Sequence, residues 1–406
     1  MPDKAIAKGY RLVFAAFVAA SLIFHLAILW ESRREIAAGY GDFIIFYTGA
    51  QIIADGKSRE LFKIETQNAY QAKFNVPQLE WPLPFNHAPY ELFLFLPFVH
   101  LSYPLAHALW SGANLILLVI MLRWLVCYDS SPHNFFIGTA VFAWFPTMEA
   151  FRMGQDSILS AALLLGVFVS LKRKRDGWAG FLLALGLYKP QLVMPMAGAL
   201  VIARLWYGLT VFTITGVMLV VVSLTMVGVQ GAFDLASILG SMGDYLFIIN
   251  PRNMPNIRGL SYVLLDPDNF AFLAGAATIA ISVALYALCL YLWRGKFDAG
   301  DPVFDLRFAL VVATTVLICY HLYAHDLFLV ALSLILLFRY VNSGQAAHRT
   351  LPGAYYVLLL IFFLPVVPRY LIASSAFGWG ALPILLLCSL LVVEIVHNER
   401  NSSSLS

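Results

Sequence analysis

The sequence predicts an all-α polytopic membrane protein, and its composition and two patterns of residues support this. Of the 406 residues, 61% are hydrophobic and only 12% are charged, whereas soluble domains contain about 45–50% apolar and about 25% charged residues. Apolar runs of span length recur along the chain, and Lys and Arg cluster between them. We therefore expect a single integral membrane domain, residues 1–406, with about 12 transmembrane helices.

The predicted spans are the apolar runs that lie between polar or basic segments, and a few of them are shorter than a full crossing. The first follows Lys4, Lys8 and Arg11 and lacks a small-residue cleavage site at its end, so it is predicted to stay uncleaved. In order, the spans are 12–30, 104–127, 134–148, 156–171, 178–188, 190–203, 209–228, 270–292, 306–322, 326–340, 352–367 and 376–396.

The basic clusters predict the orientation of these spans. Short cytoplasmic loops of membrane proteins are enriched in Lys and Arg, and the strongest cluster is the run from Lys172 to Arg175. If this run is cytoplasmic and the chain breaks at Lys189-Pro190, the remaining clusters also fall inside. Both termini are then expected in the cytoplasm, with the protein in the plasma (inner) membrane.

One apolar run, residues 88–101, does not fit as a span. It contains Pro89 and Pro97, and counting it as a crossing would place the basic run at 172–175 outside. We therefore predict an interfacial or re-entrant segment on the outer face. It belongs to a first outer loop at 31–103, and a second outer loop covers 229–269.

The charge and the cysteines exclude some functions. The formal net charge of +3 is small and dispersed, which argues against nucleic acid as a partner. The four cysteines fall in or beside apolar runs without a CxxC pair. They are predicted to be small core residues that give no information on redox compartment.

The first outer loop contains two candidate functional residues. Asp42 precedes a predicted helix at 43–54, where it could cap the helix or present a carboxylate to a lipid-borne substrate. His87 could carry a proton or bind a phosphate, or it could simply hydrogen-bond within a loop.

Further polar residues lie at the outer ends of spans. Lys189 precedes a proline between two apolar segments, where it needs an anionic partner, and a phosphate is one possibility. Arg258 in the second outer loop has the fork geometry that suits phosphate, or it could touch lipid headgroups. At the next outer turn, His325 or His321 could serve a phosphate leaving group.

Two patterns that resemble metal sites are interpreted otherwise. Asp266-Pro267-Asp268 is formally a DxD motif, but the proline predicts a turn with Asp268 or Asn269 capping the next helix. His321 and His325 would share a face if helical, yet no third ligand lies nearby in the sequence. Asp156 is expected to cap the helix that follows it. No metal and no other cofactor is expected.

The order of these motifs resembles glycosyltransferase family 87. The resemblance covers about residues 39–335 and rests on motifs that follow one another on the outer face. They are Asp42-Phe43 with Tyr47, the helix end Ala54-Asp55-Gly56, the Pro/aromatic run at 84–101, Gly154-Gln155, Lys189-Pro190-Gln191, Arg258-Gly259 and His325-Asp326.

The resemblance implies a fold of the GT-C type and an inverting hexosyltransferase, with mannose the expected sugar. The donor would be a polyprenyl-phosphate sugar, and the acceptor a glycolipid or envelope glycan at the bilayer surface. Asp42 takes the place of the catalytic residue, and Lys189, Arg258 and His325 surround the donor phosphate. Tyr47, His87, Gln155 and Asn256 are expected to contact substrate.

A secondary transporter or lipid flippase is the alternative, since these proteins also have many spans. Transporters tend to show internal repeats and ionisable residues at the bilayer midplane. Here no repeat is visible, and the polar residues gather at the outer ends of spans and in the outer loops. The pattern favours an enzyme.

Cysteine-accessibility labelling tests the predicted orientation. Single cysteines placed at 172–175 should react only from the cytoplasmic side, and those at 55–80 and 250–258 only from outside, because the basic run fixes the cytoplasmic face. Labelling of 172–175 from outside would show that 88–101 crosses the membrane.

Overall fold

The computed structural model describes residues 4–74, 83–127, 134–241, 250–265, 267–294, 298–342 and 371–403. Every regular element in these ranges is a helix, and none of them forms a strand. The prediction of an all-α protein is confirmed.

Six of the described helices are long and apolar enough to cross a bilayer, as expected for a multi-pass membrane protein. Shorter apolar helices cover Phe43–Ala54, Ser157–Lys172 and Pro190–Ile202. The expected number of about 12 spans is thus not established, and the predicted span at 352–367 lies outside the described residues. The six candidates are Ala15–Ala37, Tyr103–Leu125, Trp206–Ser241, Asn269–Trp293, Ala324–Val341 and Phe377–Arg400.

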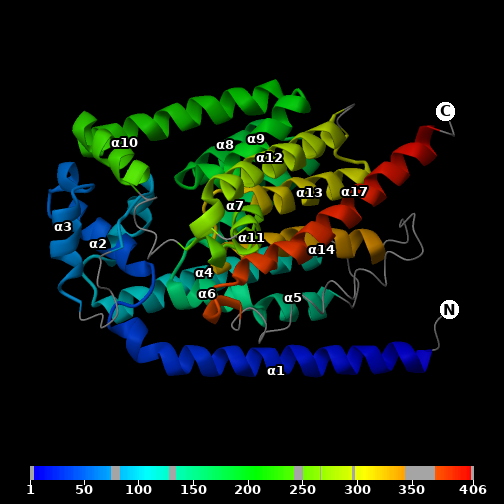
Figure 1. Ribbon diagram of the computed structural model, residues 1–406, viewed down its shortest axis with the longest axis horizontal. Coiled ribbons are helices and arrows are strands. Elements are labelled where there is room, and N and C mark those ends of the chain that lie inside the picture. Colours follow the sequence, from blue (N-terminus) through cyan, green and yellow to red (C-terminus); the bar gives the residue numbers. More distant parts are fainter. Residues whose placement is uncertain are drawn as a thin grey trace.

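The two ends of the elongated molecule differ. Helix α1 (Lys4–Ala37) runs along one edge, and its N-terminal part lies at the same end as the C-terminal part of α17 (Ala381–Ser403) (Figure 1). At the opposite end lie α2 (Phe43–Ala54) and α3 (Ile64–Gln71) (Figure 1). The helix predicted at 43–54 is confirmed residue by residue.

The proline-containing run at 88–101 does not form a continuous helix. It contains two 3₁₀ helices, η2 (Pro89–Leu94) and η3 (Leu96–Phe98), and α4 (Tyr103–Cys127) follows. A proline has no N–H to donate in a helix interior, which explains why Pro89 and Pro97 each stand at the start of a short element. These breaks agree with the predicted non-spanning segment.

The middle of the chain is built from short helices. The span predicted at 134–148 is instead two helices, α5 (Asn134–Phe142) and α6 (Phe145–Met153), because Pro146 starts a new helix. The chain also breaks at Lys189-Pro190, as predicted. The helices that follow are α7 (Ser157–Lys172), α8 (Asp176–Leu185), η4 (Gly186–Tyr188) and α9 (Pro190–Ile202).

The second half contains the most deeply buried helices. The kinked helix α10 (Trp206–Ser241) packs on α8 at the periphery, whereas α14 (Val330–Asn342) is buried against α13 (Pro302–Ile318). Helix α10 is kinked at Gly228, whose φ is 74°. A Cβ added at this position would meet no atom within 4 Å. The remaining elements are η1 (Ser58–Glu60), η5 (Pro251–Asn253), α11 (Ile257–Leu264), α12 (Pro267–Trp293), η6 (Ala324–Leu329) and η7 (Phe377–Gly380).

A glycine at the end of α6 allows α2 to approach closely. Gly154 has φ of +65°, and a Cβ there would lie 2.6 Å from Phe43 Cβ and 3.1 Å from His107 Nε2. Its carbonyl accepts a hydrogen bond from Trp110 Nε1 at 2.9 Å. The start of α2 therefore packs directly on the turn between α6 and α7.

Substituting Gly154→Ala should destabilise the protein and inactivate it, because the added methyl group must push Phe43 away from the turn. Gly56→Ala is the matched control, since Gly56 also has positive φ (+75°) but no atom within 4 Å of an added Cβ. In both variants, an alanine in the left-handed backbone conformation destabilises the fold by roughly 1–2 kcal/mol. Thermal unfolding in detergent should give a clearly larger loss for Gly154→Ala, and equal losses would contradict the packing argument.

Candidate functional site

Asp42 stands at the start of α2, but its side chain does not cap that helix. Instead, Gln155 Nε2 donates a hydrogen bond to Asp42 Oδ2 at 2.7 Å. Gln155 belongs to the turn between α6 and α7, which Gly154 brings against α2. The expected capping role is therefore not seen, and the Asp42 carboxylate points toward a group of polar side chains from other elements.

Lys189 is at the centre of this group. It lies between η4 and α9, is only 4% exposed, and forms ion pairs from Nζ to Asp156 Oδ1 at 2.5 Å and Asp326 Oδ1 at 3.0 Å. It also donates to Gln155 Oε1 at 3.3 Å. A buried ammonium needs such partners, because desolvation of an unpaired charge is costly. The predicted anionic partner exists, and in the protein itself it is a pair of carboxylates.

Asp156 was expected to cap α7, but its side chain makes no capping hydrogen bond. The carboxylate is fully buried and faces Lys189 instead. Pairing with the buried charge of Lys189 stabilises this carboxylate more than capping the helix N-terminus would, which explains the difference.

Asp326 and His325 come from η6. Ser157 Oγ donates to Asp326 Oδ1 at 2.7 Å, and His325 Nε2 lies 3.4 Å from Asp326 Oδ2. Both residues are nearly fully buried. The helical metal pair considered for His321 and His325 is not formed, because η6 begins only at Ala324 and residues 319–323 are not helical.

Arg258 approaches the same neighbourhood from α11. Its Nη1 donates to the Tyr320 carbonyl at 3.1 Å, and its guanidinium lies 3.9 Å from the centre of the Tyr320 ring. Tyr323 is within electrostatic range of both Arg258 and Asp42. The structure thus brings Arg258, His325 and Lys189 to one region around Asp42.

His87 and Glu91 complete the group. His87 Nδ1 lies 2.7 Å from Glu91 Oε2, and the Glu91 side chain is fully buried. Burial raises the pKa of Glu91 to about 8; the nearby His87 opposes this increase, and Asp156 adds to it. Glu91 was not predicted as a site residue, although a carboxylate within the apolar run 88–101 was a visible signal.

We call the eight residues described above the polar cluster. It comprises Asp42, His87, Glu91, Gln155, Asp156, Lys189, His325 and Asp326. All of them lie in short 3₁₀ elements or within two residues of the end of a helix, and they come from five distant parts of the sequence. Of these, Glu91, Asp156 and Asp326 were not among the predicted site residues.

Two of the residues predicted to contact substrate, Tyr47 and Asn256, form hydrogen bonds within the protein. Tyr47 OH donates to the Leu101 carbonyl at 2.6 Å, which ties α2 to the segment before α4. Asn256 caps α11 by accepting from Gly259 N at 2.9 Å, and its Nδ2 donates to the Cys319 carbonyl at 2.6 Å. These bonds give both side chains a structural role in the described fold.

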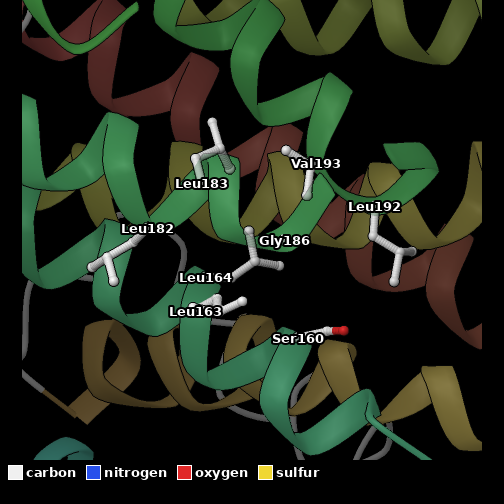
Figure 2. Close-up of a pocket in the computed structure, with 8 residues that line it drawn as sticks. All are labelled: Ser160, Leu163, Leu164, Leu182, Leu183, Gly186, Leu192 and Val193. Carbon is white, nitrogen blue, oxygen red and sulfur yellow. The ribbon is translucent and has the colours of Figure 1, made fainter. Parts of the chain in front are cut away.

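A small cavity lies next to the cluster but is not suited to a sugar. Figure 2 shows it between α7, α8 and α9, lined by leucines, Val193, Gly186 and the hydroxyl of Ser160. Its volume is about 10 Å³, which is close to the space that a single water needs. Ser160 Oγ is 3.0 Å from Tyr188 OH, so this polar atom is already paired.

A second cavity is larger and apolar. It measures about 220 Å³ and runs between α10, η2 and η4, where Phe62, Pro89, Tyr90, Leu187, Leu219 and Val227 are among the lining residues. Ala88 and Pro89 line the cavity directly after His87 in the sequence. Leu187, which also lines it, lies two residues before Lys189. The cavity therefore begins close to the polar cluster.

Removal of the central charge should destabilise the fold. In Lys189→Met, the carboxylates of Asp156 and Asp326 lose their cation in a buried site, a loss of roughly 3–5 kcal/mol in similar cases. Arg307→Met is the control, because its pair with Glu399 at 2.6 Å is more exposed and should be worth about 1 kcal/mol or less. Equal thermal stability of both variants in detergent would contradict the central role of Lys189.

Comparison with known proteins identifies the family of the chain. The model of glycosyltransferase family 87 matches residues 85–320, which is more than half of the chain and includes all of the polar cluster except Asp42, His325 and Asp326. No curated protein and no solved structure matches the chain. The chain belongs to glycosyltransferase family 87 and is a membrane glycosyltransferase.

Proposed function

We propose that this protein transfers a hexose, with mannose the first candidate, from a polyprenyl-phosphate carrier to a glycolipid or envelope glycan. The reaction would occur with inversion at the outer face of the plasma membrane, on a GT-C type of fold with both termini in the cytoplasm. The observation that carries the proposal is the placement of Asp42, a partly exposed carboxylate whose Oδ2 is held by Gln155 beside the buried cation of Lys189.

Asp42 has the properties of a general base for an acceptor hydroxyl. Gln155 occupies Oδ2, which leaves Oδ1 as the oxygen that can accept a proton. Inverting transfer needs one carboxylate that removes this proton while the sugar develops oxocarbenium character. The absence of a helix-capping bond leaves the carboxylate available for this role.

The departing phosphate needs positive charge and proton donors. Arg258 and His325 are the best candidates for direct contact, because the side-chain bonds of Arg258 go to a backbone carbonyl and to sulfur, and His325 approaches its carboxylate only at 3.4 Å. The three N–H groups of Lys189 face Asp156, Asp326 and Gln155. Lys189 can bind phosphate only by exchanging one partner, of which Gln155 is the most distant. Stabilisation of leaving-group charge by such groups is a major term in catalysis.

The apolar cavity beside the cluster supports a lipid-linked donor. A polyprenyl chain requires a hydrophobic path to the bilayer, and the wall formed by α10 is apolar except for Ser223. Much of α10 is exposed, as expected for a helix that faces lipid. The headgroup would then lie at His87 and Lys189, at the end of the cavity.

Asp42→Asn should fold and bind donor but lose transfer by roughly 10²–10⁴-fold, because an amide cannot accept the proton. The measurement is transfer of radiolabelled sugar from polyprenyl-phosphate mannose by membranes containing equal amounts of each protein. Asp55→Asn is the control, since Asp55 stands at the other end of α2 and accepts from Tyr70 OH at 2.5 Å. Near-normal turnover by Asp42→Asn would remove Asp42 from the mechanism.

A panel of donors separates the proposed substrate from other possibilities. The wild-type protein should consume a polyprenyl-phosphate hexose and leave nucleotide-linked sugars unchanged. Consumption of a nucleotide sugar alone would overturn the proposed donor while leaving the family assignment intact.

A further inference from the structure

Three side chains of the polar cluster have the arrangement of a metal site. One candidate ligand atom from each of His87, Glu91 and Asp156 lies within 4.8 Å of the others. Metal bonds to imidazole and carboxylate measure about 2.0–2.2 Å, so ligands of one ion lie roughly 3–4 Å apart. Only a small contraction would bring the three atoms around one cation.

One oxygen of each of the two carboxylates at this point lacks a hydrogen-bond donor. Glu91 is 1% exposed and Asp156 is fully buried, yet Glu91 Oε1 and Asp156 Oδ2 have no donor among the described residues. Lys189 reaches only Oδ1 of Asp156, and His87 reaches only Oε2 of Glu91. A buried carboxylate oxygen without a partner is costly, so these two atoms need either a cation or a proton between them.

The charge of the cluster is also unbalanced. Glu91, Asp156 and Asp326 contribute three negative charges, while Lys189 contributes one positive charge. Asp42 and Arg258 at the edge of the cluster cancel each other. With Glu91 ionised and His87 neutral, as metal ligands are, and with His325 neutral, two negative charges remain in the region proposed to accept an anionic phosphate. One divalent cation would neutralise them.

We propose that His87, Glu91 and Asp156 bind a divalent cation, and that its open coordination positions face the donor phosphate. One imidazole and two carboxylates form a donor set that suits Mn²⁺ or Zn²⁺. The sequence indicated no metal site because one candidate motif was interpreted as a turn and the other lacked a third ligand, whereas this set joins His87 and Glu91 to Asp156, which lies 65 positions after Glu91. The role at the phosphate rests on the proposed function, but binding of the ion does not.

The competing explanation is a proton shared between Glu91 and Asp156. A shared proton would satisfy the same two oxygens, and the raised pKa of Glu91 is compatible with it. It would supply only one positive charge, however, whereas a divalent cation supplies two. A measurement of bound metal distinguishes the two.

The test is the metal content of the full-length protein purified in detergent with a tag that contains no histidine. We expect about one Mn²⁺ or Zn²⁺ per chain in the wild type, and less than about a tenth of this in Glu91→Gln, because a neutral amide is a poor ligand. Glu149→Gln is the matched control, since Glu149 is also buried but pairs with Arg152. It should retain the metal. Equal metal in both variants would place the ion elsewhere and overturn the proposal.

A second measurement keeps the proposal testable if Glu91→Gln does not fold. Wild-type protein stripped with a chelator should gain thermal stability when Mn²⁺ or Zn²⁺ is restored, because a ligand that binds only the folded state stabilises it. A wild type that contains no metal and is not stabilised by Mn²⁺, Zn²⁺ or Mg²⁺ would show that the carboxylates share a proton instead. Neither readout uses sugar transfer, so a protein that binds metal but transfers no sugar would refute the proposed function alone.

Discussion

The fold of this glycosyltransferase depends on one buried cation. Lys189 lies between Asp156 and Asp326, and these three residues join the starts of α7, α9 and η6 at a single point. Each ion would be prohibitively expensive in an apolar interior without the others. The requirement to pair them fixes how three separate helices meet, and it holds Gln155 and Ser157 in place through hydrogen bonds to the same groups.

The contacts of the polar cluster extend from Lys189 in two directions. Gln155 connects Lys189 to Asp42, so the carboxylate proposed as the base is positioned by the same ion-paired centre. On the other side, Asp156 and Glu91 face each other near His87, next to the apolar cavity below α10. A lipid-linked sugar phosphate that entered along α10 would therefore meet buried charge first and the base beyond it.

Membrane proteins keep ionisable groups inside the bilayer region only where pairing or function requires them. Here the side chains of the polar cluster lie at or close to helix ends, where breaks at Pro146, Pro190 and Gly154 let short segments meet. The polar cluster therefore depends on the short helices, because the breaks between them bring its side chains together. Continuous spans would have hidden these side chains within separate helices.

The sequence by itself determined the membrane class, the family, the helix at 43–54, the break at Lys189-Pro190 and the polar character of Asp42, Gln155, Lys189 and His325. These features follow from local composition and motif order, which a linear reading can detect. Only the tertiary structure decided the partners. Asp42 and Asp156 each occupy a position typical of a helix cap, and nothing local reveals that they interact instead with the Gln155 amide and the buried Lys189 charge, each more than 30 residues away. The contacts of Glu91 with His87 and Asp156 were likewise visible only in the tertiary structure. Long-range pairing in a low-dielectric interior outweighs local preference.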